Sequence, residues 1–246
     1  MLVRKIAKKR SPNRRTDRLV KAFVTGEFRR NLMLWAAKHG RMFPWRKANA
    51  TLYHQVVSEV LLQRTRAEAV ATFWPIFVKR FPNWKAIANS APSTIEAILK
   101  PLGLSKQRAP RLKGLAIAIT SNNARFPKTR EDVEALPGVG QYIANAIELF
   151  VHKKPRPLID VNMARVLERY FGPRSLADIR FDTYLQHLAQ RVVQCNQPLL
   201  VNWGILDLAA SICTREKPAC PACPLRRGCR YGRQVTRAAT RPAAAP

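Results

Sequence analysis

The sequence has few acidic residues, no long apolar run and few histidines. Its 246 residues include 15 Asp and Glu against 44 Lys and Arg, a formal net charge of +29. This excess predicts a polyanionic partner, because each Lys or Arg set against a phosphate releases condensed counterions. No stretch approaches the roughly 18 apolar residues of a membrane span, and residues 1–18 lack the apolar core of a signal peptide. We therefore expect a soluble, intracellular protein whose partner is not a membrane.

The scarcity of histidine and of alternating apolar patterns further restricts the class of protein. The four histidines are scattered, which gives little support to a nuclease or hydrolase built on histidine. No stretch alternates with period two for long enough to predict a strand. Hydrophobic residues nevertheless make up 47% of the chain, enough to fill a core and to exclude a disordered protein. We therefore expect an all-α protein with one large or two small domains.

Apolar spacing predicts the helices. One is expected from about residue 19 to Gly40, and a second from 52 to 73 with Glu59, Gln63 and Arg66 on its polar stripe. Shorter helices are predicted at 84–88, 93–99 and 106–121.

Four cysteines near the C-terminal end form the strongest pattern. Six, two and five residues separate them. Thiols so close together cannot each reach a distant disulfide partner, and an intracellular chain would not keep disulfides. We therefore expect a metal centre whose ligands are Cys213, Cys220, Cys223 and Cys229. The single Cys-x-x-Cys pair favours a [4Fe-4S] cluster over a zinc site, which more often uses two such pairs. Cys195 is expected to be a core residue of an apolar helix.

A short glycine turn precedes an apolar helix in the middle of the chain. Its two glycines flank one apolar residue, so backbone amides can turn outward and the following helix adds its positive end. Alone, such a turn is more often an ordinary helix connection. Preceded by Leu-Pro in so basic a chain, it is a candidate helix-hairpin-helix motif that would grip a DNA backbone. The expected phosphate-binding residues are Gly138, Val139, Gly140 and Gln141.

Asp160 ends an apolar stretch and precedes a predicted helix that runs through Tyr170. Its position alone favours an N-cap, which accepts hydrogen bonds from the next amides. The alternative is a catalytic acid. Eighteen residues separate Asp160 from Tyr142, which leaves room for a helix and a return loop that let both face one cleft.

Together, the segments 136–140, 160–166 and 213–229 resemble the helix-hairpin-helix DNA glycosylases that carry an iron-sulfur cluster. The resemblance runs from about residue 41 to 232. It implies a two-lobed all-α fold with DNA across the cleft and the target nucleotide flipped out, because the glycosidic carbon is inaccessible inside the stack. The implied organisation is a basic disordered arm at 1–18, a helical barrel with the hairpin at 43–154, a cluster domain from 19–42 and 155–231, and a disordered tail at 232–246.

The resemblance also implies site roles. Endonuclease III-like members have a lysine where Tyr142 stands, and a phenol cannot form the Schiff base that leads to strand cleavage. The chain therefore resembles a monofunctional glycosylase, without efficient AP lyase activity, in which Asp160 stabilises positive charge on the sugar and orients water. Glu59 resembles the glutamate that adenine and thymine mismatch glycosylases present to the flipped base. On the helix wheel alone, Glu59 would be a solvated residue beside Arg66.

Tyr142 and Glu59 do not identify the excised base, because the resemblance places both residues in the adenine and in the thymine mismatch glycosylases. Adenine glycosylases usually append a further domain after the cluster, and only 17 residues follow Cys229. The Gln63-Arg64 pair and the run 102–109 also resemble the thymine branch. We expect removal of thymine or uracil opposite guanine, with removal of adenine opposite guanine or 8-oxoguanine as the alternative.

The remaining candidate residues are expected to hold double-stranded DNA that contains a mismatched or deaminated base. Gln63 would fill the gap left in the stack. The other DNA-binding candidates are Arg64, Asn162, Arg226 and Arg227. We expect a monomer, located with DNA in the cytoplasm or nucleoid if prokaryotic, whose cluster serves structure and DNA positioning. A non-catalytic DNA-binding iron-sulfur protein is the rival of another class.

Overall fold

The computed structural model describes residues 22–239, with side chains from residue 25 to 235. Every regular element in this range is a helix, which confirms the all-α prediction. None of these helices is long and apolar enough to span a bilayer. The predicted arm, residues 1–18, lies outside the described residues. The elements are α2 (Ala22–His39), η1 (Pro44–Arg46), α3 (Leu52–Leu62), α4 (Ala67–Arg80), α5 (Trp84–Ala88), α6 (Pro92–Leu99), η2 (Lys100–Leu102), α7 (Ser105–Ser121), α8 (Arg130–Glu134), α9 (Gln141–Phe150), α10 (Val161–Phe171), α11 (Thr183–Val193), α12 (Pro198–Ser211), η3 (Cys220–Ala222) and α13 (Arg230–Ala239).

The chain divides into two compact units. The first, here called the cysteine unit, runs up to Gly40 and resumes at Ile159; the second, the hairpin unit, is Arg41–Leu158. The predicted barrel range, 43–154, falls within the hairpin unit.

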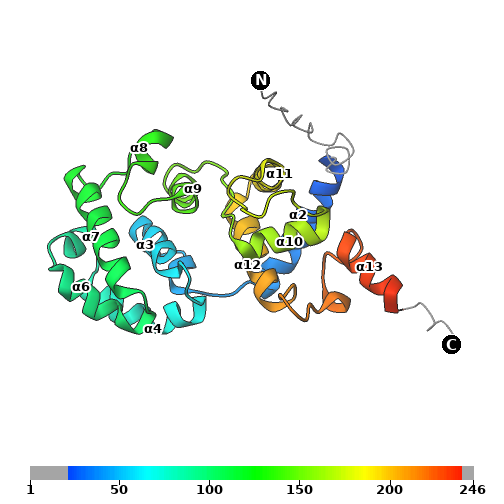
Figure 1. The fold of residues 1–246 in the computed structure, drawn as a ribbon, viewed down its shortest axis with the longest axis horizontal. Coiled ribbons are helices and arrows are strands. Elements are labelled where there is room, and N and C mark those ends of the chain that lie inside the picture. The colour runs from blue at the N-terminus through cyan, green and yellow to red at the C-terminus, as the bar shows by residue number, and fades with distance from the viewer. Residues whose placement is uncertain (1–21, 240–246) are drawn as a thin grey trace, which may run out of the picture. The chain divides into compact units, whose positions relative to one another are not determined.

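In the hairpin unit, α7 is the helix with the most extensive helix–helix packing. Helices α5 and α6 pack against it, while α3 packs against α9, and α8 also packs against α9 (Figure 1). Leu112, Leu115 and Ile119 recur at helical spacing along α7 and are buried. Helix α9 is buried along most of its length, from Ile143 to Phe150. The packing of α3 on α9 joins segments about 80 residues apart and positions the candidate site.

The predicted helix 52–73 is wrong, because the structure contains two helices there. Helix α3 ends at Leu62 and α4 starts at Ala67. Between them, Arg64 adopts a left-handed backbone with φ of 57°. We call residues 63–66 the α3–α4 turn. Gln63 and Arg66 therefore lie on this turn and not on a polar stripe of one helix.

In the cysteine unit, α2 and α10 pack against α12, and α11 and α13 pack against α10 (Figure 1). Phe28, Leu32 and Ala36 recur at helical spacing along α2 and are buried, while Trp35 on the same helix is half-buried. Gly204 of α12 lets the two helices approach closely, since a Cβ there would lie 3.1 Å from the Cβ of Ala36.

Two further expectations for this unit are wrong. The tail from residue 232 was predicted to be disordered, but its residues up to Ala239 belong to helix α13, which starts at Arg230. This helix is supported by Arg169 of α10, whose guanidinium carbon lies 4.9 Å from the centre of the Tyr231 ring. Cys195 follows the end of α11 and is partly exposed, so it is not a core residue of a helix.

Candidate active site

Glu59 and Tyr142, which the resemblance placed in one site, are in direct contact. The Tyr142 hydroxyl donates a hydrogen bond of 2.9 Å to Oε2 of Glu59. Glu59 is only 3% exposed, so the alternative of a solvated residue beside Arg66 is wrong. A buried carboxylate needs hydrogen-bond partners, and the phenol supplies one.

The α3–α4 turn presents the two residues predicted to meet the base stack. Gln63 follows the last residue of α3 and is half-exposed, and Arg64 is exposed. These two residues follow Glu59 by four and five positions along the chain. Both residues are at the surface, as contact with DNA requires.

The glycine turn has the geometry expected of a phosphate site, with one exception. Gly138 has a φ of 74°, which favours glycine, and a Cβ on Gly140 would meet no atom within 4 Å. Helix α9 begins at Gln141, so its positive end lies at this open side of the turn. Val139 differs from expectation, because it is buried and its amide donates to the carbonyl oxygen of Leu136. Its amide is therefore used within the turn.

A buried carboxylate that sequence reasoning missed holds the chain after α9. Glu148 is 1% exposed and forms ion pairs with Arg130 at 2.8 Å, Lys154 at 3.0 Å and Arg156 at 2.9 Å. Burial alone would raise the pKa of Glu148, but hydrogen bonds from Lys154, Arg130 and Arg156 outweigh it and lower the pKa to about 2. The cluster ties α8 and the 152–158 segment to α9.

We predict that Glu148→Gln lowers the free energy of unfolding at pH 7 by about 3 kcal/mol, because the native state favours the ionised form. The lowered pKa means that this stabilisation is complete above the ordinary glutamate pKa, 4.5, and is lost as the pH falls towards 2. Urea unfolding at several pH values measures it. Equal stability of the two proteins at pH 7 would contradict the prediction.

Asp160 caps α10, as the N-cap interpretation expected. Its Oδ1 accepts hydrogen bonds from the amides of Asn162 at 2.9 Å and Met163 at 2.7 Å. Its Oδ2 accepts one from Nδ2 of Asn162 at 2.6 Å. Asp160 is half-exposed, and no residue in the described range forms an ion pair with it. Capping occupies one oxygen, which leaves the other held by a single side chain.

Asn162, predicted to bind DNA, supports this carboxylate. Its Nδ2 donates to Asp160, and its Oδ1 accepts a hydrogen bond of 3.1 Å from Arg165. Arg165 also donates to the carbonyl oxygens of Cys213 and Ala209. Asp160 is thereby linked to the start of the cysteine segment.

The four predicted metal ligands lie on one segment between α12 and α13. The pKa of Cys223 is raised to about 11, mainly by burial and to a smaller extent by the charges of Cys229, Cys213 and Cys220. Within the part of the chain that the structure describes, no three His, Cys, Asp or Glu side chains form a ready metal site. The four partly exposed free thiols nevertheless match, in number and chemistry, the ligands of a [4Fe-4S] cluster.

Arginines that sequence reasoning missed hold this segment. Arg169 donates to the Sγ of Cys213 at 3.3 Å and to the carbonyl oxygen of Thr214 at 2.6 Å. The Cys229 thiol in turn donates to the carbonyl oxygen of Arg169. Arg165 and Arg169 are four residues apart on a predicted helix, and this spacing was the available signal, because it places both on one face.

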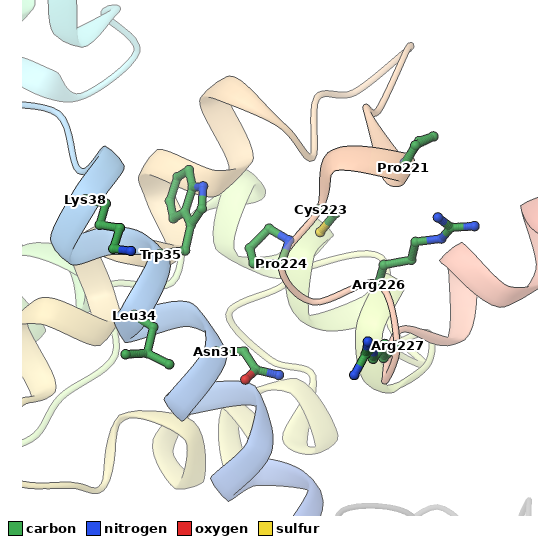
Figure 2. Close-up of a pocket in the computed structure, with 9 residues that line it drawn as sticks. All are labelled: Asn31, Leu34, Trp35, Lys38, Pro221, Cys223, Pro224, Arg226 and Arg227. Carbon is green, nitrogen blue, oxygen red and sulfur yellow. The ribbon is translucent and has the colours of Figure 1, made fainter.

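Arg226 and Arg227 lie on the same segment and line a cavity of about 560 Å³ within the cysteine unit. Figure 2 shows the two arginines on the loop that follows Cys223 and Pro224, with α2 on the opposite side. Lys38 adds a third positive charge, and no acidic residue is among the lining residues. Both arginines are exposed and form no ion pair with any residue of the described range, so they are available for phosphates.

The chain is similar to known proteins in both sequence and fold. The family model of the HhH-GPD superfamily base excision DNA repair proteins matches residues 57–189. The thymine-DNA glycosylase of Aeropyrum pernix is 37% identical over 208 residues, covering 82% of this chain and 93% of the relative. The thymine/uracil-DNA glycosylase of Pyrobaculum aerophilum is 35% identical over 204 residues, covering 81% and 88%. Adenine DNA glycosylases also match, at lower identity.

A solved structure supports the same assignment. A thermostable thymine-DNA glycosylase superposes with a TM-score of 0.78 at 30% identity, covering 86% of this chain and 98% of that one. The family match covers more than half of the chain and includes the hairpin, Glu59, Tyr142 and Asp160. The chain belongs to the HhH-GPD superfamily of base excision DNA repair proteins.

Proposed function

We propose that this protein is a monofunctional DNA glycosylase that removes thymine or uracil opposite guanine by hydrolysing the N-glycosidic bond. The observation that carries the proposal is the hydrogen bond between Tyr142 and the buried Glu59. A phenol occupies the position where an amine would form a Schiff base, so water is left as the nucleophile. Identity is higher to thymine and thymine/uracil-DNA glycosylases than to adenine DNA glycosylases, which favours the pyrimidine.

Asp160 supplies the charge that the reaction needs. Breaking the bond between sugar and base builds positive charge on the sugar, and a preorganised carboxylate stabilises it by several kcal/mol where water is excluded. The two amides on Oδ1 fix the carboxylate before DNA binds. The same carboxylate orients the attacking water.

Glu59 contacts the flipped base or its water, and Tyr142 lines the pocket. Because Tyr142 donates to Oε2, Glu59 acts as an acceptor in this pair. This fits a binding or water-ordering role on thymine. Removal of adenine would instead require Glu59 as a general acid towards N7.

The DNA backbone is held by the hairpin and by the cysteine segment. Gly138, Gly140 and the start of α9 bind phosphates, as do Arg226 and Arg227, and Gln63 fills the gap left by the flipped nucleotide. Cys213, Cys220, Cys223 and Cys229 would hold a [4Fe-4S] cluster, which when bound supplies structure and positions DNA. The protein acts as a monomer on double-stranded DNA within the cell.

A panel of duplexes tests the function. Each carries one G·T, G·U, A·G or A·8-oxoguanine pair, and alkali after incubation cleaves every abasic site. We expect breaks at thymine of G·T and uracil of G·U, and no strand break before alkali. A break at adenine alone would establish the adenine alternative, and no break in any duplex would favour the non-catalytic DNA-binding protein.

A further inference from the structure

Arg108 is a buried arginine that connects α7 to the α3–α4 turn. The side chain is 6% exposed. Its Nη2 donates to the carbonyl oxygen of Gln63 and, at 2.6 Å, to Oγ1 of Thr65. These acceptors are 45 and 43 residues away in the sequence. One guanidinium nitrogen therefore holds the turn on both sides of Arg64.

The turn has an unfavourable backbone that such contacts can maintain. Arg64 has a φ of 57°, and the left-handed region costs about 1–2 kcal/mol for a residue with a Cβ. Thr65 adds a hydrogen bond of 3.4 Å from its hydroxyl to the carbonyl oxygen of Gln63. Gln63 thus has its backbone carbonyl fixed while its side chain remains at the surface.

Burying the Arg108 guanidinium in the core also costs free energy of folding. Burial lowers the pKa of its guanidinium, and its Nη1 is buried without a hydrogen-bond partner in the described part of the chain. A buried donor left unpaired costs about 1–3 kcal/mol. An aliphatic side chain would fill the same space without that cost, so packing alone does not account for an arginine here.

We propose that Arg108 is a positioning residue that holds the α3–α4 turn in the conformation from which Gln63 enters the base stack. The inference rests on the proposed function, since it takes Gln63 as the residue that fills the gap. A turn ordered in the free protein loses no further conformational entropy on binding DNA. Arg108 does not touch DNA itself and acts through Gln63.

The test compares Arg108→Met and Arg108→Lys with the wild type. Methionine keeps an apolar side chain of similar length and removes both hydrogen bonds. Lysine keeps a nitrogen that can donate to the same two oxygens. Flipping is followed by the fluorescence of 2-aminopurine placed beside the target thymine of a G·T duplex, and excision by single-turnover rates. We expect Arg108→Met to reduce both by about tenfold or more, because small misplacements of positioning groups have effects of up to about 10²-fold. Arg108→Lys should restore part of the loss.

Lys113→Met is the matched control. Lys113 lies on the same helix and donates, at 2.6 Å, to the carbonyl oxygen of Ser90 in a different loop. Removing it deletes the same kind of contact without touching the α3–α4 turn. We expect flipping and excision within about twofold of the wild type, well short of the effect that misplaced positioning groups produce.

A second duplex separates positioning from general loss of structure. Extra mismatches beside the G·T pair weaken stacking, so flipping depends less on Gln63. The Arg108→Met defect should shrink on this duplex. An equal defect on both duplexes would overturn the inference, as would wild-type flipping and excision by Arg108→Met.

Thr65→Val carries the same test if Arg108→Met does not fold. The substitution is nearly isosteric, at a half-exposed residue, and removes one acceptor of Arg108. We expect a smaller loss of flipping and excision than for Arg108→Met, again mainly on the duplex whose flanking bases are fully paired. No loss on that duplex would overturn the inference. A wild-type protein that releases no base from any duplex would instead contradict the proposed function, so the two failures are distinguishable.

Discussion

Asp160→Asn protein is expected to bind a G·T duplex as tightly as the wild type and to release thymine about 10²- to 10³-fold more slowly, the usual effect of removing one electrostatic stabiliser. The fold should persist, because an asparagine oxygen can accept the same amides of Asn162 and Met163. The substitution removes the negative charge and the acceptor of the hydrogen bond from Nδ2 of Asn162, while the two cap hydrogen bonds remain. Single-turnover excision and DNA affinity, measured on the same preparation, separate the two effects.

Asp182→Asn is the matched control for this variant. Asp182 is another aspartate N-cap, at the start of α11, and its carboxylate accepts hydrogen bonds from the amides of Leu185, Ser175 and Leu176. The substitution removes the same charge and should lower the melting temperature, because an amide group cannot accept all three. We expect excision at the wild-type rate. A similar loss of excision in both variants would show that Asp160 acts through stability alone.

Tyr142→Lys is expected to convert the protein into one that nicks DNA at the abasic site. A lysine amine can attack the sugar carbon and form the Schiff base that a phenol cannot form. The hydrogen bond from Tyr142 to Glu59 places position 142 beside the carboxylate proposed to contact the flipped base. Borohydride should trap a covalent complex with DNA in the variant and none in the wild type.

Gln141→Lys adds the same amine one residue earlier in α9 and serves as its control. Neighbouring residues on a helix point about 100° apart, so this lysine should not reach the sugar. Trapping by both variants would indicate non-specific amine chemistry. Trapping by neither would contradict the position assigned to Tyr142.

Much of this fold could be predicted from local pattern. The helix at 84–88 has the predicted bounds, and α6 and α7 each start one residue earlier than predicted. The apolar periodicity and the proline breaks carried that information. Helix α12 was not predicted, because it has apolar residues on all of its faces and shows no amphipathic spacing.

The errors arose where distant residues decide local structure. The continuous apolar pattern of residues 52–73 predicted one helix, but Arg108 bonds to the turn at Gln63 and Thr65 from over 40 residues away. The Glu148 cluster likewise joins charges from α8 and from the segment after α9, which no local spacing reveals. At the α3–α4 turn, tertiary contacts override helix propensity.

The candidate site was predicted from the resemblance to the glycosylases, because residue pattern alone favoured a solvated Glu59 and an N-cap Asp160. The resemblance identified Glu59, Tyr142 and Asp160, and the contact between the first two is present. The DNA contact predicted for Asn162 stays a prediction, and the structure shows in addition that its side chain reaches back to the capping carboxylate. This local hydrogen bond was not predicted from the sequence.

The most direct measurement of the central claim is the identity of the released base. Wild-type protein in excess is incubated with a G·T duplex, and the free base and both strands are quantified by mass spectrometry without alkali. The account predicts free thymine in an amount equal to an intact abasic strand. Strand cleavage without free thymine, or an unchanged duplex, would contradict it.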